Sequence, residues 1–255
     1  KKKNFEKLMN AILSERPVMQ WKLKLDIHEF YEEVEPNFTY SNIVDKLILK
    51  RSNLETNDSW GDKTPHYLND VDTIAELFPQ AKFIYIIRDG RDVALSLLKK
   101  PWGPCNIIAC AEYWSMLNRQ SATIEALEKN GQLLQIYYEE LLNSPKIIID
   151  RIYEFLDEEC SIEQRNKLAE AAKSNNFNKW RDSMSKSQIR RFEAIAKPTL
   201  SRLGYPVDNS HPKLYPFELS LAELHNVSKR WLFLINTNLI DGFKIRFLGK
   251  EPFNE

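Results

Sequence analysis

Two short apolar runs stand out from the pattern of hydrophobic and polar positions along the chain. Residues 82–87 read KFIYII and residues 133–137 read LLQIY, and both runs are rich in aliphatic and aromatic side chains. Pro79 precedes the first run and Gly131 precedes the second. Short apolar runs between turn-forming residues are typical of buried strands in parallel sheets. The pattern therefore predicts two buried strands.

Most other apolar positions recur at the spacing of one helix face, and polar capping residues, prolines and glycines mark the ends of these segments. We expect helices over residues 4–16, 21–35, 41–52, 72–78, 106–129, 144–156, 161–173, 185–203 and 219–236, and a terminal strand or extension over residues 243–248.

The stretch KFIYIIRDGRDVALSLL, residues 82–98, joins the first predicted strand to a helix that Asp89 or Asp92 can cap. It places Arg88 at the carboxyl end of a strand, where open α/β sheets bind ligands, and Ser96 about two turns into the helix. A guanidinium with a nearby hydroxyl is suited to a phosphate, because it offers paired donors in a fixed geometry. An ordinary ion-paired surface turn is the alternative interpretation.

The charges of the chain balance, with 36 acidic and 36 basic residues among 255. No overall field therefore points to nucleic acid or to a membrane surface as the partner. An apolar fraction of 43% suffices for one sizeable core. The basic residues nevertheless gather into two clusters, which fit a small polyanionic ligand: Arg88, Arg91, Lys99 and Lys100, and then Lys179, Arg181, Lys186, Arg190 and Arg191.

Cysteine and histidine positions indicate neither a disulfide framework nor a metal site. The three cysteines cannot all pair with one another, and the four histidines are scattered. No run approaches the length of a membrane span, and the first residues lack an apolar signal core. We therefore expect a cytoplasmic protein without a metal and without membrane insertion.

A second polar motif, GDKTPHYL, occupies residues 61–68. Thr64 as N-cap and Pro65 at the first helical position predict a helix start there. Asp62 and Lys63 then lie at a helix N-terminus, which attracts anions. The alternative is that Asp62 only stabilises the helix start while Lys63 is solvated.

These motifs occur in the order found in one family of enzymes. GDKTPHYL, RDGRDVALS at residues 88–96, YYEELLNSP at 137–145, and later KWR and LGY together resemble sulfotransferases that use 3′-phosphoadenosine 5′-phosphosulfate (PAPS), of the bacterial and carbohydrate type. The resemblance implies an α/β fold, a P-loop NTPase-like core with a short parallel sheet flanked by helices. We expect this core over residues 1–210. The resemblance stops at residue 211, and we interpret residues 211–255 as a C-terminal extension packed on the core.

The resemblance also implies roles for individual residues. Arg88 and Ser96 would hold the 3′-phosphate of PAPS, together with the basic residues of the KWR loop, and Tyr138 would lie by the adenosine. Trp180 belongs to that loop, and we interpret it first as a packing residue, as is usual for such aromatics. The implied nucleotide-binding residues are Arg88, Ser96, Tyr138, Lys179, Trp180 and Arg181.

The catalytic candidates come from the GDKTPHYL motif. By the resemblance, Asp62 is the base that removes the proton of the acceptor, where glutamate is common in the family. His66 is the fallback base. Lys63 would neutralise charge on the leaving phosphate and the sulfuryl oxygens.

The implied reaction moves a sulfuryl group from PAPS to a hydroxyl or amine, leaving 3′-phosphoadenosine 5′-phosphate, with no metal. The acceptor is a small molecule, a carbohydrate or a carrier-borne group, and the oligomeric state is open. The first glycine of the sequence is Gly61, so the Gly-rich loop that sulfotransferases place around the 5′-phosphosulfate is not in it. The alternatives are a degenerate nucleotide-binding or interaction module and a small-molecule kinase, which needs a Gly-x-x-x-x-Gly-Lys-Ser/Thr loop.

Overall fold

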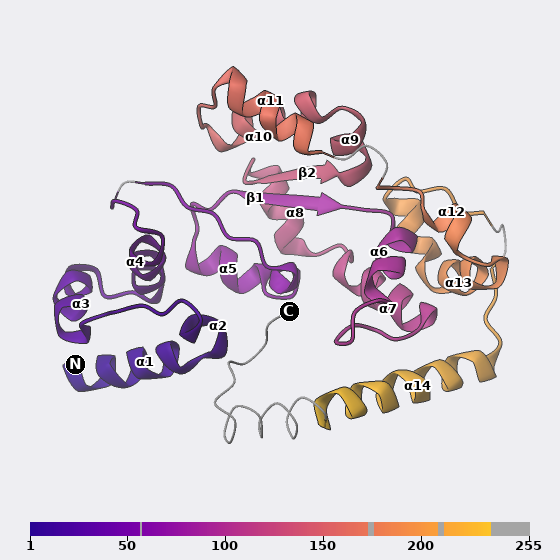
Figure 1. Cartoon of the computed structure of the whole chain (residues 1–255), viewed down its shortest axis with the longest axis horizontal. Coiled ribbons are helices and arrows are strands. Elements are labelled where there is room, and N and C mark those ends of the chain that lie inside the picture. The colour runs from indigo at the N-terminus through magenta and orange to yellow at the C-terminus, as the bar shows by residue number, and fades with distance from the viewer. Residues whose placement is uncertain (57, 173–175, 209–211, 236–255) are drawn as a thin grey trace. The chain divides into compact units, whose positions relative to one another are not determined.

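The computed structural model describes residues 1–56, 58–172, 176–208 and 212–235 (Figure 1). These residues form two compact units, Lys1–Ala81 and Lys82–Glu255, and each is described by itself. The predicted boundary at residue 210 stays a prediction. The predicted strand or extension over residues 243–248 lies outside the described residues.

The first unit is helical throughout its regular elements. Its core joins apolar side chains of the first three longer helices, including Phe5, Phe30 and Leu47. The ring of Phe5 meets the ring of Tyr31 edge-on, with 5.2 Å between the ring centroids. The elements are α1 (Lys2–Ser14), α2 (Arg16–Met19), α3 (Ile27–Val34), η1 (Glu35–Asn37), α4 (Tyr40–Ser52), η2 (Pro65–Asn69) and α5 (Val71–Leu77).

Two predicted helices of this unit have different bounds in the structure. The helix expected from residue 21 begins at Ile27, because the Asp26 side chain accepts hydrogen bonds from the backbone N–H groups of His28 and Glu29. The helix expected to end at Pro17 ends at Ser14, and Pro17 lies in the first turn of α2. Proline is tolerated there because first-turn N–H groups have no partner within the helix.

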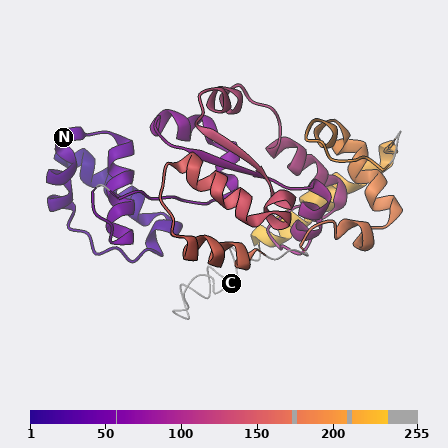
Figure 2. The same ribbon diagram turned by 90° about the horizontal axis from the view of Figure 1, so that it is seen from above.

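The second unit contains both predicted strands, which pair in parallel. Ile87 lies opposite Tyr137, so the carboxyl ends of the strands lie at the same edge of the sheet (Figures 1 and 2). The described part of the chain is thus mostly helical, with a short two-stranded parallel sheet. The elements are β1 (Phe83–Ile87), α6 (Gly90–Leu97), α7 (Ile107–Leu117), α8 (Ala122–Lys129), β2 (Leu133–Tyr137), α9 (Tyr138–Asn143), α10 (Pro145–Leu156), α11 (Ile162–Ala171), α12 (Trp180–Ser183), α13 (Lys186–Arg202) and α14 (Pro216–Ile235).

The single helix expected over residues 106–129 is wrong, because α7 and α8 are separate helices. The side chain of Asn118 donates a hydrogen bond to the carbonyl of Trp114 at 2.8 Å, at the end of α7. The hydroxyl of Ser121 accepts a hydrogen bond from the N–H of Ile124 and begins α8. Two polar side chains that bind backbone groups locally thus interrupt an otherwise helical pattern.

The core of the second unit lies among β1, α6, α7 and α13. It contains Ile87, Trp114, Trp180 and Phe192, and none of these side chains is more than 3% exposed. The Trp114 and Phe192 rings lie 6.0 Å apart, centroid to centroid. This core lies directly beneath the turn between β1 and α6, which carries the RDGRD motif.

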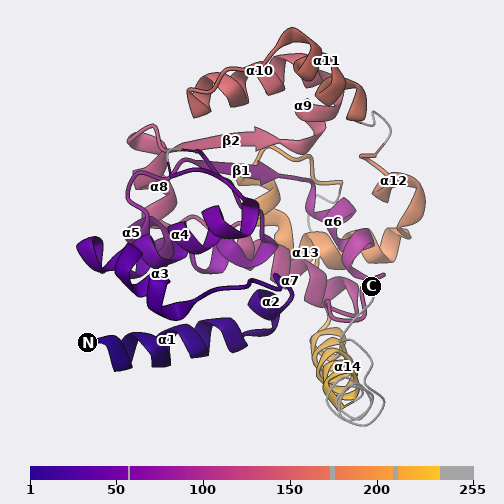
Figure 3. The ribbon, with the colours of Figure 1, turned by 60° about the vertical axis from the view of Figure 1, so that its left-hand side comes forward.

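The helix α14 packs on α7 (Figure 3). Asn106 donates a side-chain hydrogen bond to the carbonyl of Ala222 at 2.9 Å. The carboxylate of Glu218 accepts hydrogen bonds from Arg190 at 2.7 Å and Arg191 at 2.8 Å. The bond from Arg190 is the main cause that lowers the pKa of Glu218 to about 2. Arg190 and Arg191, assigned by the sequence to a ligand-binding cluster, are thus paired within the fold.

No helix among the residues that the structure describes is long and apolar enough to cross a membrane.

Candidate functional site

Arg88 follows directly after β1 and makes contacts with three other segments. Its Nη2 donates a hydrogen bond to the backbone carbonyl of Asn176 at 2.7 Å. Its guanidinium lies over the ring of Tyr138, 4.6 Å from the ring centroid, and Nη2 lies 3.9 Å from an oxygen of Asp92. The Nε atom is buried and has no hydrogen-bond partner among the described residues. The Arg88 side chain as a whole is 22% exposed, so part of its guanidinium faces solvent.

Asn176 forms hydrogen bonds with three of the candidate residues of the second unit. Its side-chain nitrogen donates to the hydroxyl of Tyr138 at 2.9 Å, and its side-chain oxygen accepts from the ammonium of Lys179 at 2.8 Å. Arg88, Tyr138 and Lys179, which the sequence predicted separately, thus gather around one asparagine at the carboxyl edge of the sheet. The sequence analysis missed Asn176, and the only signal for it was its place in the polar loop before the KWR motif.

Trp180 is fully buried, so its contacts are with the protein. Its ring lies between two guanidinium groups, 3.7 Å from that of Arg91 and 4.4 Å from that of Arg181. Its backbone N–H donates to the carboxylate of Asp92 at 3.0 Å. Burial raises the pKa of Asp92, and the Trp180 bond and the charge of Arg88 oppose that rise. These contacts favour the packing interpretation of Trp180, while Arg181 is exposed beside it.

Ser96 lies on the exposed surface of α6. No described hydrogen bond joins it to Arg88, and its role at the 3′-phosphate stays a prediction.

Arg91 is fully buried and does not belong to a ligand-facing basic cluster, which corrects the sequence-based grouping. Its Nε and Nη2 donate to the two oxygens of Asp89 at 3.0 and 2.8 Å. Its Nη1 donates to Glu193 of α13 at 3.0 Å. The paired geometry with Asp89 is the strongest arrangement that arginine makes with a carboxylate. The second arginine of the RDGRD motif therefore supports the turn that carries the first.

Further, partly buried polar contacts join the segments that follow the two strands. One oxygen of Glu139 accepts from the backbone N–H of Asp89 at 3.0 Å, and the other accepts from the hydroxyl of Tyr205 at 2.9 Å. Burial, followed by the charge of Glu139, raises the pKa of Tyr205. These contacts fix the turn after β1 relative to the turn after β2.

Gly90 lies against the indole of Trp114. A Cβ atom at position 90 would lie 2.4 Å from the indole, closer than real Cβ contacts. The same indole donates a hydrogen bond to the carbonyl of Arg88 at 3.2 Å. The small size of Gly90 therefore allows the indole to support the backbone that presents Arg88.

We expect Gly90→Ala to lower the free energy of unfolding by about 1–3 kcal/mol, the usual cost of overpacking. Urea denaturation measures this change. Gly61→Ala is the control, because a Cβ there meets nothing within 4 Å. A Gly90→Ala protein as stable as the control would contradict the close contact.

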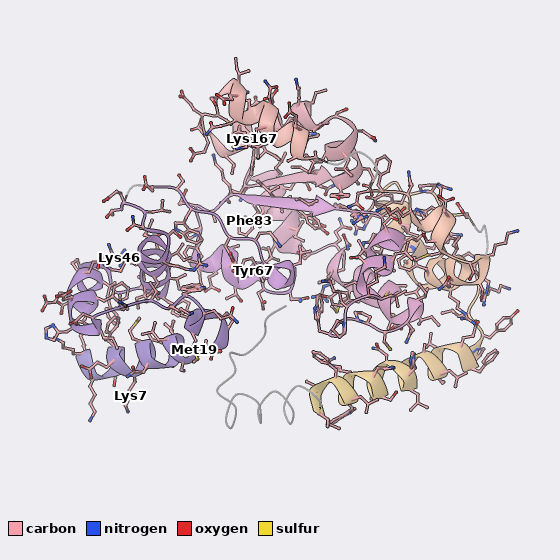
Figure 4. The ribbon with its side chains drawn as sticks, in the orientation of Figure 1. Lys7, Met19, Lys46, Tyr67, Phe83 and Lys167 are labelled. Atoms are coloured by element: carbon pink, nitrogen blue, oxygen red, sulfur yellow. The ribbon has the colours of Figure 1, made fainter. Side chains whose placement is uncertain are left out.

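The catalytic candidates lie in the first unit, next to η2. The hydroxyl groups of Tyr67 and Thr64 both donate to one carboxylate oxygen of Asp62, the latter at 3.4 Å. Tyr67, labelled in Figure 4, is 42% exposed, and its pKa is raised by burial and then by the bond to Asp62. Asp62 and Lys63 are exposed. The side chain of His66 lies outside the described part of the structure.

The helix start predicted at Thr64 is a five-residue 3₁₀ turn, and the Thr64 side chain does not cap it. Thr64 instead donates to Asp62. The electric field of a helix dipole is therefore weaker at Asp62 and Lys63 than the sequence suggested, because the field grows with the number of aligned peptide units.

The catalytic candidates belong to Lys1–Ala81 and the nucleotide-binding candidates to Lys82–Glu255. That they form one site stays a prediction. Within the described ranges, no group of three or more His, Cys, Asp or Glu side chains is placed to hold a metal ion.

The described part of the chain is mostly helical, and cationic side chains lie at the carboxyl edge of its short parallel sheet, where open α/β sheets bind ligands. Comparison with known proteins names the family, since the model described as "Sulfotransferase family" matches residues 3–161. The chain belongs to the sulfotransferase family, whose members transfer a sulfuryl group from PAPS. The family prediction from the sequence motifs is therefore confirmed.

The chain is also similar to curated proteins of nematodes. It is 27% identical over 201 residues to a putative protein-tyrosine sulfotransferase of Caenorhabditis elegans, covering 69% of this chain and 76% of the relative. The corresponding protein of Caenorhabditis briggsae is 28% identical over 174 residues, covering 59% and 61%. Protein-tyrosine sulfotransferase A of Caenorhabditis elegans is 26% identical over 195 residues, covering 66% of this chain and 50% of the relative.

Proposed function

We propose that this chain binds PAPS through its second unit and transfers the sulfuryl group to a hydroxyl of an acceptor. The observation that carries the proposal is the gathering of Arg88, Tyr138 and Lys179 at the carboxyl edge of β1 and β2. Family membership supports the reaction class. We also propose that the fold is a P-loop NTPase-like core, as family membership implies.

The donor groups at this edge fit a phosphate better than a carboxylate or a sugar. Arg88 offers a planar guanidinium on a side chain that is 22% exposed, and the Lys179 ammonium adds a second positive charge. Two cations match a phosphate that carries close to two negative charges at neutral pH. We assign these residues to the 3′-phosphate, with the Tyr138 ring on the side of the adenosine. Ser96 and Arg181 remain candidates for the same phosphate.

Bound PAPS supplies the activated sulfuryl group, and the residues of the chain supply the proton chemistry and charge. Asp62 would accept the proton of the attacking hydroxyl, with Tyr67 and Thr64 orienting the carboxylate through their hydrogen bonds. Lys63 would neutralise negative charge as the phosphate leaves. His66 is the alternative base.

For the acceptor we propose the phenol of a tyrosine in a peptide. The support comes from the similar nematode proteins, which are named as a putative protein-tyrosine sulfotransferase and as protein-tyrosine sulfotransferase A. A phenol with an ordinary pKa of about 10 is protonated at neutral pH and gains from a general base. A carboxylate such as Asp62 suits this requirement.

Isothermal titration calorimetry with 3′-phosphoadenosine 5′-phosphate, adenosine 5′-phosphate and ATP tests the nucleotide site. We expect the first ligand to bind about 100-fold more tightly than the second, since each hydrogen bond to a charged group contributes about 1.5–3 kcal/mol. Arg88→Ala removes most of this preference. Arg165→Ala is the matched control, because Arg165 pairs with Asp150 on the surface.

A wild-type protein with no preference for the 3′-phosphate would contradict the proposal. Tight ATP binding with no such preference would instead favour the kinase alternative. Binding with the expected preference but without turnover would favour a nucleotide-binding module.

A further inference from the structure

Asn176 contacts Arg88, Tyr138 and Lys179, although no motif singled it out. Its backbone carbonyl accepts from Arg88, and its side chain bonds both Tyr138 and Lys179. We propose that Asn176 is a positioning residue that sets the preference for a 3′-phosphate by holding Lys179 and Tyr138 beside Arg88. This inference rests on the proposed function, because it concerns the same nucleotide site.

The Lys179 side chain is exposed and bonds to Asn176. A lysine side chain loses much rotamer freedom when a ligand immobilises it. The 2.8 Å bond from the Lys179 ammonium to the Asn176 side-chain oxygen restricts that freedom before a ligand arrives. Part of the entropy cost of binding a phosphate is therefore already met in the free protein.

The orientation of Arg88 also depends on Asn176, through Tyr138. The Asn176 side chain donates to the Tyr138 hydroxyl at 2.9 Å, and this bond restricts the Tyr138 ring. The guanidinium of Arg88 lies over that ring, 4.6 Å from its centroid. A cation over an aromatic face is attracted to it and takes its orientation from it. Asn176 therefore acts on Arg88 through Tyr138 as well as through its own carbonyl.

The Asn176 side chain is uncharged, which matters for binding an anion. The nearest carboxylate, Asp92, lies 3.9 Å from Arg88 and already accepts from the backbone of Trp180. Asn176 accepts from two cationic side chains without adding a negative charge near the proposed phosphate. An aspartate of the same size at position 176 can still accept from Lys179, and it can accept from the Tyr138 hydroxyl in place of donating to it, but it repels an anion. The pair of variants, alanine and aspartate, thus separates hydrogen bonding from charge.

The test measures the affinities of Asn176→Ala and Asn176→Asp for 3′-phosphoadenosine 5′-phosphate and adenosine 5′-phosphate by calorimetry. We expect Asn176→Ala to lower the affinity for 3′-phosphoadenosine 5′-phosphate about tenfold and the affinity for adenosine 5′-phosphate by less than about twofold. The reason is the loss of the two side-chain hydrogen bonds that Asn176 makes with Tyr138 and Lys179. At low salt, Asn176→Asp lowers the affinity for 3′-phosphoadenosine 5′-phosphate further than Asn176→Ala does, and added salt reduces that extra loss. Asn143→Ala, an exposed asparagine of the same unit, is the control and leaves both affinities unchanged.

The outcomes separate this inference from the proposed function. If Asn176→Ala keeps the full preference while Arg88→Ala loses it, the positioning role is overturned and the nucleotide site stands. If both ligands weaken in equal proportion, Asn176 is only structural and the inference is overturned. If the wild-type protein has no preference, the proposed function fails, and the inference fails with it. Thermal unfolding checks that each variant is folded, and Asn176→Leu, which has a similar volume and no side-chain hydrogen-bonding group, carries the test if the alanine variant is not.

Discussion

Replacing Arg91 with alanine is expected to lower the free energy of unfolding by about 3–5 kcal/mol, the usual cost of removing one partner from a buried ion pair. Asp89 and Glu193 lose the guanidinium to which they are paired, and the side chains of all three residues are at most 4% exposed. Trp180 also loses the guanidinium that packs on its ring at 3.7 Å. The effect is large because the remaining carboxylates have no access to water.

Chemical denaturation monitored by tryptophan fluorescence measures this loss. The matched control is Arg165→Ala, since the pair of Arg165 with Asp150 is 2.7 Å long but partly exposed. Exposed ion pairs contribute about 0–1 kcal/mol. Equal stability of the two variants would show that the Arg91 cluster is not a supporting element of the RDGRD turn.

Replacing Asp62 with asparagine is expected to lower the turnover number by a factor of about 100 or more, the range found for removal of a general base. The amide keeps the size of the side chain and can still accept hydrogen bonds from Tyr67 and Thr64, but it cannot take a proton. Affinity for 3′-phosphoadenosine 5′-phosphate stays within about twofold, since its proposed contacts involve other residues.

Sulfuryl transfer from PAPS to a tyrosine-containing peptide, measured with calorimetric nucleotide binding, tests this prediction. Asp72→Asn is the control, because Asp72 is an exposed carboxylate of the same unit in α5. Normal turnover of Asp62→Asn would remove Asp62 from the role of base and make His66 the next residue to replace. A loss of nucleotide binding in the same variant would point to a structural effect.

The elements that depend on local patterns were predicted well from the sequence. Both strands have nearly the expected bounds, and the helix expected to end before Gly204 begins after the capping residue Ser185. The failures have local causes that an apolar pattern does not contain. Asn118 and Ser121 divide the helix expected over residues 106–129 through side-chain bonds to the backbone.

The candidate site was predicted in part, because motifs name residues but not their partners. Arg88, Tyr138 and Lys179 were each expected from separate motifs. Arg91 looked like a surface cation until its buried partner Glu193, 102 residues later, was placed beside it. Asn176 escaped for the same reason, since its partner Arg88 lies 88 residues away in sequence. Contacts of this separation follow from the tertiary fold alone.

The parallel pairing of β1 with β2 also has a consequence for how the protein is made. Parallel strands need a long crossover between them, and here α6, α7 and α8 lie in that crossover. As the chain emerges from the ribosome, the sheet edge cannot form before Tyr137 is free, and the cationic cluster cannot close before Lys179 follows it. Arg88 and Lys179 can therefore come together only after residue 179 has been synthesised, during the slow, non-local phase of folding.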